Sequence, residues 1–148
     1  MADAPVLLGD IHAGDRFTTA RRTITEADMM AFAGVTGDFN AVHTDAVYAR
    51  DEAPFGRRIV HGPMVLGTSF GLRSVRDRWK ILALLECRRR FLAPVFPGDT
   101  IQGHYTVEEA RPSASRPGSG VVTLAVRIVN ERDEVVQEGT DVLMVADA

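Results

Sequence analysis

The chain has 148 residues, of which 45% are hydrophobic and 25% charged, a balance typical of one soluble globular domain spanning residues 1–148. Its net charge of −3, from 20 acidic and 17 basic residues, excludes the strongly basic surface expected of a nucleic-acid-binding domain. The single cysteine, Cys87, excludes an internal disulfide, and we expect it to be a small strand residue without a catalytic role.

The sequence gives no indication of export or membrane insertion. The first ten residues include Asp3 and Asp10 but no basic segment, and no apolar run is long enough to cross a bilayer. We therefore expect a cytoplasmic location and no membrane partner.

The first part of the chain predicts one strand followed by helices and a loop. Residues 16–24 are rich in Thr and Arg and predict a strand. Thr25 is expected to cap a helix that carries Asp28 in its first turn and ends at Gly34 or Val35. A loop over 38–43, a short helix from 45 to about 50 and an irregular segment over 51–58 are expected next.

A central helix is predicted for residues 62–72. This segment contains no charged residue, which is the pattern of a helix buried on every side. Pro63 fits the first turn, where its missing N–H costs nothing. Gly67 and Gly71 are four residues apart, so they would let another backbone approach one face of the helix closely.

The second half predicts antiparallel strands with turns at 97–99 and 111–120. In one of these strands, apolar residues alternate with others, which indicates one buried face; they are Val122, Leu124, Val126 and Ile128. A meander that follows a single central helix predicts an α+β hot-dog fold, in which an antiparallel sheet wraps around that helix. The four predicted strands are 81–92, 100–110, 120–130 and 134–145.

Asp38, His43 and Gly62 are the residues predicted to carry the chemistry. A carboxylate and an imidazole that can converge on one water are the minimum for adding or removing water across a double bond. Backbone N–H groups at a helix start, here at Gly62, can bind the negative charge that develops on a carbonyl oxygen. This chemistry needs no metal or other cofactor, and the four histidines lack ligand spacing in the sequence.

Three segments resemble the MaoC-like hydratases, the (R)-specific enoyl-CoA hydratase group. They are GDFNAVH at 37–43, IVHG at 59–62 and FLAPVFPGDT at 91–100, and the resemblance runs from about Phe17 to the C-terminus. It implies a hot-dog fold, usually a homodimer with the acyl tunnel along the interface. It also implies syn addition or loss of water on an acyl thioester of CoA or an acyl carrier protein, with (R)-3-hydroxy stereochemistry. The catalytic aspartate and histidine fall on Asp38 and His43, and the amide that faces the thioester carbonyl falls on Gly62.

The chain departs from the family pattern at two places. Many members have proline where this chain has Ala41, which should loosen the loop without altering the chemistry. Some members have a serine in the central helix, and a gapless count from Gly62 places Phe70 at that position, with Ser69 adjacent. The role of that serine is therefore not transferred to this chain.

Arginine pairs and aromatic residues supply further substrate-binding candidates. Arg57-Arg58 and Arg88-Arg89-Arg90 suit the phosphate groups of a small ligand, although solvated faces or ion-pair partners are the alternative. The candidates for substrate binding are Asn40, Phe39, Pro63, Phe70, Arg57 and Arg58.

Several residues also have a purely structural interpretation. Asn40 is expected to organise the loop rather than to react, His61 is expected to be structural, and His104 has no expected function. Phe39, Phe55, Met64 and Phe70 are expected in a tunnel or the core, and Tyr48 and Trp79 in packing.

Two other functions are compatible with this pattern. Hot-dog folds also hydrolyse acyl thioesters, although Gly-Asp-x-Asn-x-x-His fits hydration better than a thioesterase. A non-catalytic subunit that only completes a partner's acyl tunnel is the second alternative. The exposed sheet edges of the predicted meander favour a homodimer or a multiple of it.

Overall fold

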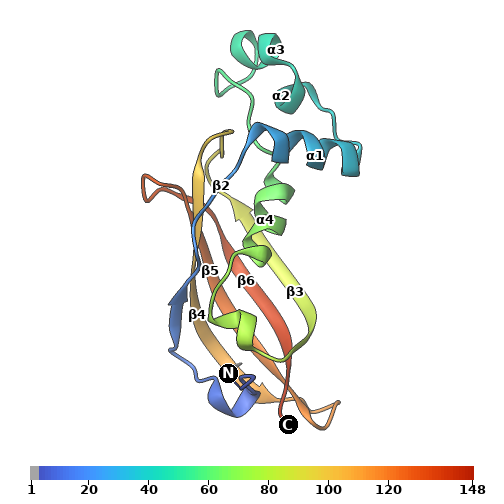
Figure 1. Cartoon of the computed structure of the whole chain (residues 1–148), viewed down its shortest axis with the longest axis vertical. Helices are drawn as coiled ribbons and strands as arrows, with labels where there is room; N and C mark the ends of the chain where they lie inside the picture. The colour runs from blue at the N-terminus through green and yellow to red at the C-terminus, as the bar shows by residue number, and fades with distance from the viewer. Residues whose placement is uncertain (1–3) are drawn as a thin grey trace.

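The computed structural model describes residues 4–148, so Asp3 of the acidic N-terminal stretch lies outside the described residues. An antiparallel sheet forms the body of the molecule (Figure 1). β1 (Arg16–Thr18) and β2 (Arg22–Thr23) pair with β4, and β3 forms the opposite edge. The four predicted strands are confirmed to within two residues; in spatial order they are β4 (Thr100–Pro112), β5 (Ser119–Val129), β6 (Val135–Ala146) and β3 (Ile81–Phe91).

The prediction of one continuous strand over 16–24 is wrong, because the chain leaves the sheet between β1 and β2. The hydroxyl of Thr19 accepts the Gly103 N–H at 2.9 Å and donates to the Ala20 carbonyl at 2.8 Å. The Ala20 N–H turns to the Arg73 carbonyl instead of β4, at 2.7 Å. These bonds interrupt the pairing with β4, which resumes at Arg22 opposite Ile101.

The predicted N-cap of the first helix is confirmed. α1 (Glu26–Thr36) begins with Thr25 accepting the Asp28 N–H at 3.1 Å, while the Asp28 carboxylate accepts the Thr25 N–H at 2.9 Å. The helix ends slightly later than predicted, at Thr36, because Gly37 adopts a left-handed φ of 74° and closes it.

The prediction of a loop through residue 43 is wrong for its second half. A short helix, α2 (Ala41–Thr44), begins after Asn40 and carries His43. The next helix, α3 (Ala46–Asp51), is confirmed, and Asp45 caps it by accepting two backbone N–H groups. These two helices and α1 lie at one end of the molecule, beyond the sheet (Figure 1).

The central helix is confirmed as α4 (Gly62–Gly71), but it is not buried on every side. Met64 and Val65 are buried against the sheet, whereas Pro63, Gly67 and Gly71 are exposed in the described chain. A Cβ added to Gly67 or Gly71 would meet no atom within 4 Å, so no backbone approaches these glycines closely.

The core lies between α4 and the concave face of the sheet, as the hot-dog prediction requires. The four alternating residues of β5 are all buried, which confirms that predicted face; they are Val122, Leu124, Val126 and Ile128. Trp79 packs edge-on against Phe17 at 5.7 Å, as predicted, whereas Tyr48 is exposed. Two short 3-10 helices complete the described fold, η1 (Leu8–Asp10) and η2 (Val75–Arg78). Within residues 4–148, no helix combines the length and hydropathy needed to cross a bilayer.

Candidate active site

Asp38 follows directly after the turn at Gly37 and is oriented by the loop that it begins. Its Oδ1 accepts the Asn40 N–H at 3.2 Å, which leaves Oδ2 free to face His43. Asn40 caps α2, because its Oδ1 accepts the Val42 N–H at 3.2 Å. The structure therefore gives Asn40 a loop-organising contact, and its amide oxygen is already occupied.

His43 is held in one tautomer by a backbone carbonyl. Its Nδ1 lies 2.8 Å from the Ile59 carbonyl oxygen, which can only accept, so Nδ1 carries the proton. The lone pair of Nε2 is then free, and this nitrogen lies 3.9 Å from Oδ2 of Asp38. Two groups at that separation can both bond to one water at ordinary hydrogen-bond lengths.

His61 supports this pair from behind. Its ring is completely buried and stacks on the His43 ring, with centroids 3.8 Å apart and planes 25° apart. Its Nε2 donates to the Asp38 carbonyl at 2.9 Å, which ties the backbone of Asp38 to the start of α4. The structural role expected of His61 is therefore to hold Asp38 beside the His43 imidazole.

The fold also brings histidine nitrogens close to a carboxylate, which the sequence spacing did not predict. Ligand atoms of Asp38, His43 and His61 lie within 4.8 Å of one another. Imidazole binds a metal through a lone pair in the plane of its ring. Nε2 of His61 already donates to the Asp38 carbonyl, so that nitrogen has no free lone pair for a metal. The arrangement fits two imidazoles packed for support better than a metal centre.

Gly62 provides a backbone donor next to this pair. It is the first residue of α4, so its N–H has no acceptor within the helix, and among the described residues no hydrogen bond uses it. Pro63 follows and has no N–H, which leaves the Gly62 amide as the donor at this end of the helix. Gly62 directly follows His61, whose ring stacks on the His43 imidazole.

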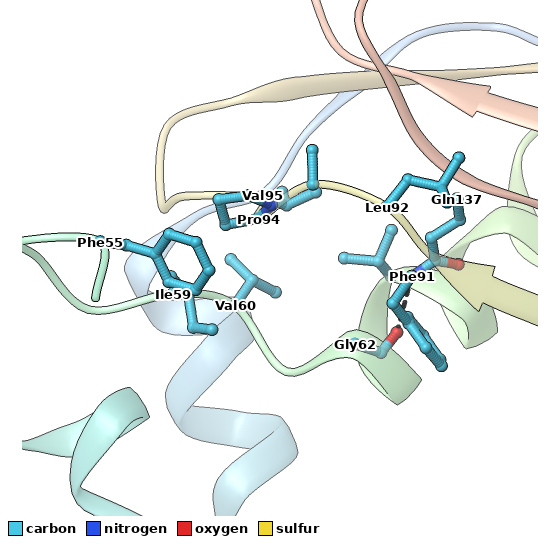
Figure 2. Close-up of a pocket in the computed structure, with 11 residues that line it drawn as sticks. Phe55, Ile59, Val60, Gly62, Phe91, Leu92, Pro94, Val95 and Gln137 are labelled. Carbon is cyan, nitrogen blue, oxygen red and sulfur yellow. Dashed lines mark hydrogen bonds between the residues drawn. The ribbon is translucent and has the colours of Figure 1, made fainter. Parts of the chain in front are cut away.

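A mostly apolar cavity of about 320 Å³ opens at Gly62 (Figure 2). An added Cβ on Gly62 would lie 2.8 Å from Cε1 of Phe91, so a larger residue there requires the exposed Phe91 ring to move. Asp38 and His43 do not line the cavity but connect to its wall through the Ile59 carbonyl. The lining residues are Phe55, Ile59, Val60, Gly62, Val65, Phe91, Leu92, Ala93, Pro94, Val95 and Gln137.

None of the six predicted substrate-binding residues lines this cavity. Phe39 is 59% exposed and does not contribute to the cavity or the core, contrary to expectation. Pro63 is exposed at the second position of α4, and Phe70 is half-buried near Arg89, whose guanidinium lies 5.9 Å from its ring centroid. Ser69 is buried and its hydroxyl donates to the Leu66 carbonyl, so it is not directed at the cavity.

The arginine pair borders a second hollow of about 420 Å³, lined by Ala46, Arg50, Gly56, Arg57, Arg58 and Pro97. Arg57 stacks over the Phe96 ring, with its guanidinium carbon 3.6 Å from the ring centroid, and none of the described residues accepts from its N–H groups. Arg58 has a protein partner, because its Nη2 lies 2.6 Å from a Glu26 carboxylate oxygen. The two arginines are therefore not equivalent as phosphate ligands.

Sequence reasoning missed the residues that form most of the cavity wall. The segment 91–95 was noted as part of a motif but not assigned to the site, and Gln137 was not singled out at all. Cys87 lies half-buried on β3, where burial raises the pKa of its thiol; it is protonated at neutral pH, which fits the expected lack of a catalytic role.

Comparison with known proteins gives one family match and several relatives. The family described as MaoC like domain matches residues 10–130. Protein MaoC of Klebsiella aerogenes is 40% identical over 98 residues, which cover 66% of this chain and 29% of that protein. The (R)-specific enoyl-CoA hydratase of Aeromonas caviae is 32% identical over 105 residues, covering 71% of this chain and 74% of the hydratase.

A solved structure extends the similarity to the whole described fold. It is described as a monoamine oxidase regulatory protein from Archaeoglobus, and it superposes with a TM-score of 0.89 at 31% identity. The superposition covers 100% of this chain and 99% of that one. The arrangement of sheet and central helix is therefore shared across the full length of both chains.

Proposed function

The chain belongs to the family of MaoC-like domains, and from this premise we propose that it is a hydratase or dehydratase of enoyl thioesters. The observation that supports this most directly is the 3.9 Å separation between Nε2 of His43 and Oδ2 of Asp38. The free N–H of Gly62 follows His61, which stacks on His43. The substrate is an enoyl thioester of CoA or an acyl carrier protein, and the product of hydration is the (R)-3-hydroxyacyl thioester. We also propose that residues 1–148 form one hot-dog domain.

The proposed chemistry balances without a cofactor. A water held between Asp38 and His43 gives its oxygen to C3, and one of the two groups accepts its proton. The same proton is passed to C2 on the same face, so the π bond is replaced by C3–O and C2–H bonds and the pair returns to its starting state. The Gly62 N–H stabilises the negative charge that develops on the thioester oxygen during addition.

The second hollow suggests where the distant end of the thioester lies. Arg57 and Arg50 border it, and Arg57 keeps its N–H groups free while stacked on Phe96. A guanidinium in this position suits the phosphates of a CoA or phosphopantetheine group. Arg58 supports the site indirectly, because it pairs with Glu26 and holds α1 near α2.

We also propose that two copies of the chain form a homodimer. β3 is an unpaired edge of the sheet and exposes several leucines, of which Leu82, Leu84 and Leu85 are each about half exposed. An apolar, unpaired edge is a template for pairing with another strand. Antiparallel pairing of β3 with its copy satisfies the free backbone groups and covers this apolar surface.

The test measures loss of enoyl absorbance and release of free thiol in the same sample. We expect absorbance to fall without thiol release, and Asp38→Asn and His43→Gln each to reduce turnover at least about a hundredfold. Asp133→Asn and His104→Gln are matched controls in exposed positions away from the site, and both should keep full activity.

Two other outcomes would redirect the assignment. Stoichiometric thiol release would indicate a thioesterase. A folded protein inactive on enoyl thioesters of every chain length would indicate a non-catalytic subunit. Wild-type turnover in either folded site variant would remove the Asp38–His43 assignment.

A further inference from the structure

Gln137 lies on the inward face of β6, where its side chain reaches the start of α4. The residue is 2% exposed, and its Nε2 donates to the Gly62 carbonyl at 3.0 Å (Figure 2). Together with the Phe91 ring, this bond fixes the residue whose N–H faces the proposed thioester oxygen.

The oxygen of the Gln137 side-chain amide, Oε1, has no partner among the described residues. The Gly62 carbonyl can only accept, so the amide must turn Nε2 toward it and Oε1 away from it. Oε1 is buried, and none of the described residues donates to it. Leaving a buried acceptor unpaired is unfavourable, so this oxygen is suited to a donor that arrives with a ligand.

The cavity itself narrows the choice of ligand. Of the described residues that line it, Gln137 alone has a polar side chain. The cavity runs from Gly62 and Gln137 at one end to Phe55 and Pro94 at the other (Figure 2). Gly56 and Arg57, which follow Phe55 in the chain, border the basic hollow. A flexible, mostly apolar arm can thus extend from the basic hollow to Gly62.

This inference rests on the proposed function, which supplies a ligand with one suitable donor. The acyl part of an enoyl thioester has no N–H or O–H group, and the hydroxyl of the hydrated product lies at C3, beside Asp38 and His43. The pantetheine arm carries an amide N–H two methylene groups beyond the sulfur, on the side away from the acyl chain. We propose that Oε1 of Gln137 accepts a hydrogen bond from this amide and so places the thioester carbonyl against the Gly62 N–H.

The experiment compares two small enoyl thioesters that differ only at this donor. One is the N-acetylcysteamine thioester, and the other is the thioester of 2-acetoxyethanethiol, in which an ester oxygen replaces the N–H. We expect the wild-type protein to prefer the amide substrate in kcat/KM by about tenfold, the range for leaving a buried acceptor unpaired. In Gln137→Met, which keeps the side-chain length, kcat/KM should be about equal for the two substrates.

Gln102→Met is the matched control. Gln102 lies on β4, where it donates to the Thr19 carbonyl, and it does not line the cavity. It should keep the wild-type preference. The ratio of kcat/KM for the two substrates can be measured on the wild-type protein alone, so the test holds even if Gln137→Met does not fold.

Three results would overturn the inference. Equal use of both substrates by the wild-type protein would mean that Oε1 is satisfied by water. An equal loss on both substrates in Gln137→Met would mean that Gln137 acts only through Gly62. If the wild-type protein hydrates neither thioester nor any enoyl-CoA, the proposed function fails and the inference fails with it; hydration of both with an equal ratio removes the inference alone.

Discussion

At Gly62, a side chain would press on a specific neighbour, the Phe91 ring. An added Cβ would lie 2.8 and 2.9 Å from two ring carbons of Phe91, closer than such atoms approach in proteins. Even alanine therefore has to displace the ring or the start of α4, and valine adds backbone restriction to the same conflict. Any displacement moves the N–H that we assign to the thioester oxygen.

We expect Gly62→Ala to lower kcat by at least about tenfold and Gly62→Val by about a hundredfold or more, approaching the loss of an oxyanion donor. KM should change less than kcat, because the charge develops in the transition state. Gly67→Ala is the control on the same helix, since a Cβ there meets nothing within 4 Å. Full activity in a folded Gly62→Val protein would assign the oxyanion to another donor.

The buried pair of Arg89 and Asp141 is a second residue-scale feature, and it lies away from the catalytic pair. Arg89 Nη1 and Nη2 donate to the two carboxylate oxygens at 2.7 and 3.0 Å, and both side chains are at most 1% exposed. The Asp141 carboxylate holds the pKa of Arg89 above its ordinary value despite the opposing effect of burial. Removing one partner leaves a buried charge uncompensated.

We expect Asp141→Asn to lower the free energy of unfolding by about 3–5 kcal/mol, measured by chemical denaturation. The double variant Arg89→Met/Asp141→Leu should recover much of this loss, because it removes both charges. Asp51→Asn breaks an exposed pair with Arg50 and should have little effect. Equal stability of Asp141→Asn and the wild-type protein would mean that water reaches the guanidinium.

At the scale of the element, the start of α1 links stability to pH. The pKa of Asp28 lies below its ordinary 3.8, chiefly because its carboxylate accepts the Thr25 backbone N–H. The Thr25 hydroxyl and the nearby Arg22 lower this pKa further. A depressed folded-state pKa contributes stability that is present above pH about 4 and is lost as pH falls through the folded-state value. The cap is therefore fully formed at neutral pH.

We expect Thr25→Ala to lower the free energy of unfolding by about 1 kcal/mol at pH 7, with Thr25→Ser close to the wild-type protein. Asp28→Asn should reduce the loss of stability between pH 5 and 3. Unfolding curves recorded across this range check both statements. If the acid-limb slope of Asp28→Asn matches that of the wild-type protein, the cap does not contribute to it.

Elements with long or strongly patterned sequences could be predicted, and short or context-dependent ones could not. The alternation in β5 and the Thr25 cap are local signals, and both are confirmed. α2 was missed because four residues show no periodicity, and the break at Thr19 depends on a bond to Gly103, far away in the sequence. Strand and helix boundaries set by such long-range bonds are not encoded locally.

In the candidate site, too, residues in a local motif could be predicted and those held by long-range contacts could not. Asp38, His43 and Gly62 are close in sequence and carry a motif, so they could be selected as candidates. Gln137 could not, because its contact with Gly62 joins residues 75 positions apart and depends on the register of β6. Arg89 looked like one of three similar arginines, and only the sheet distinguishes it from its exposed neighbours.

At the scale of the whole molecule, the proposed homodimer depends on the open edge of β3. We expect Leu84→Lys to convert the proposed homodimer to a monomer, because it places a charge on the apolar edge that a second copy would cover. Val75→Lys changes another exposed apolar residue, on η2, and should leave the dimer intact. Sedimentation or light scattering at micromolar concentration measures both, and a monomeric wild-type protein would contradict the assembly.

The first and last segments of the described chain lie close together, at the pole opposite α1, α2 and α3 (Figure 1). Lys80 joins them, since its N–H donates to the Val6 carbonyl at 3.0 Å and its carbonyl accepts the Ala146 N–H at 2.9 Å. Additional polypeptide can be attached there without passing near Asp38, His43 or the cavity. This geometry lets the fold serve as a module that can be fused in tandem or tethered to a surface at this pole.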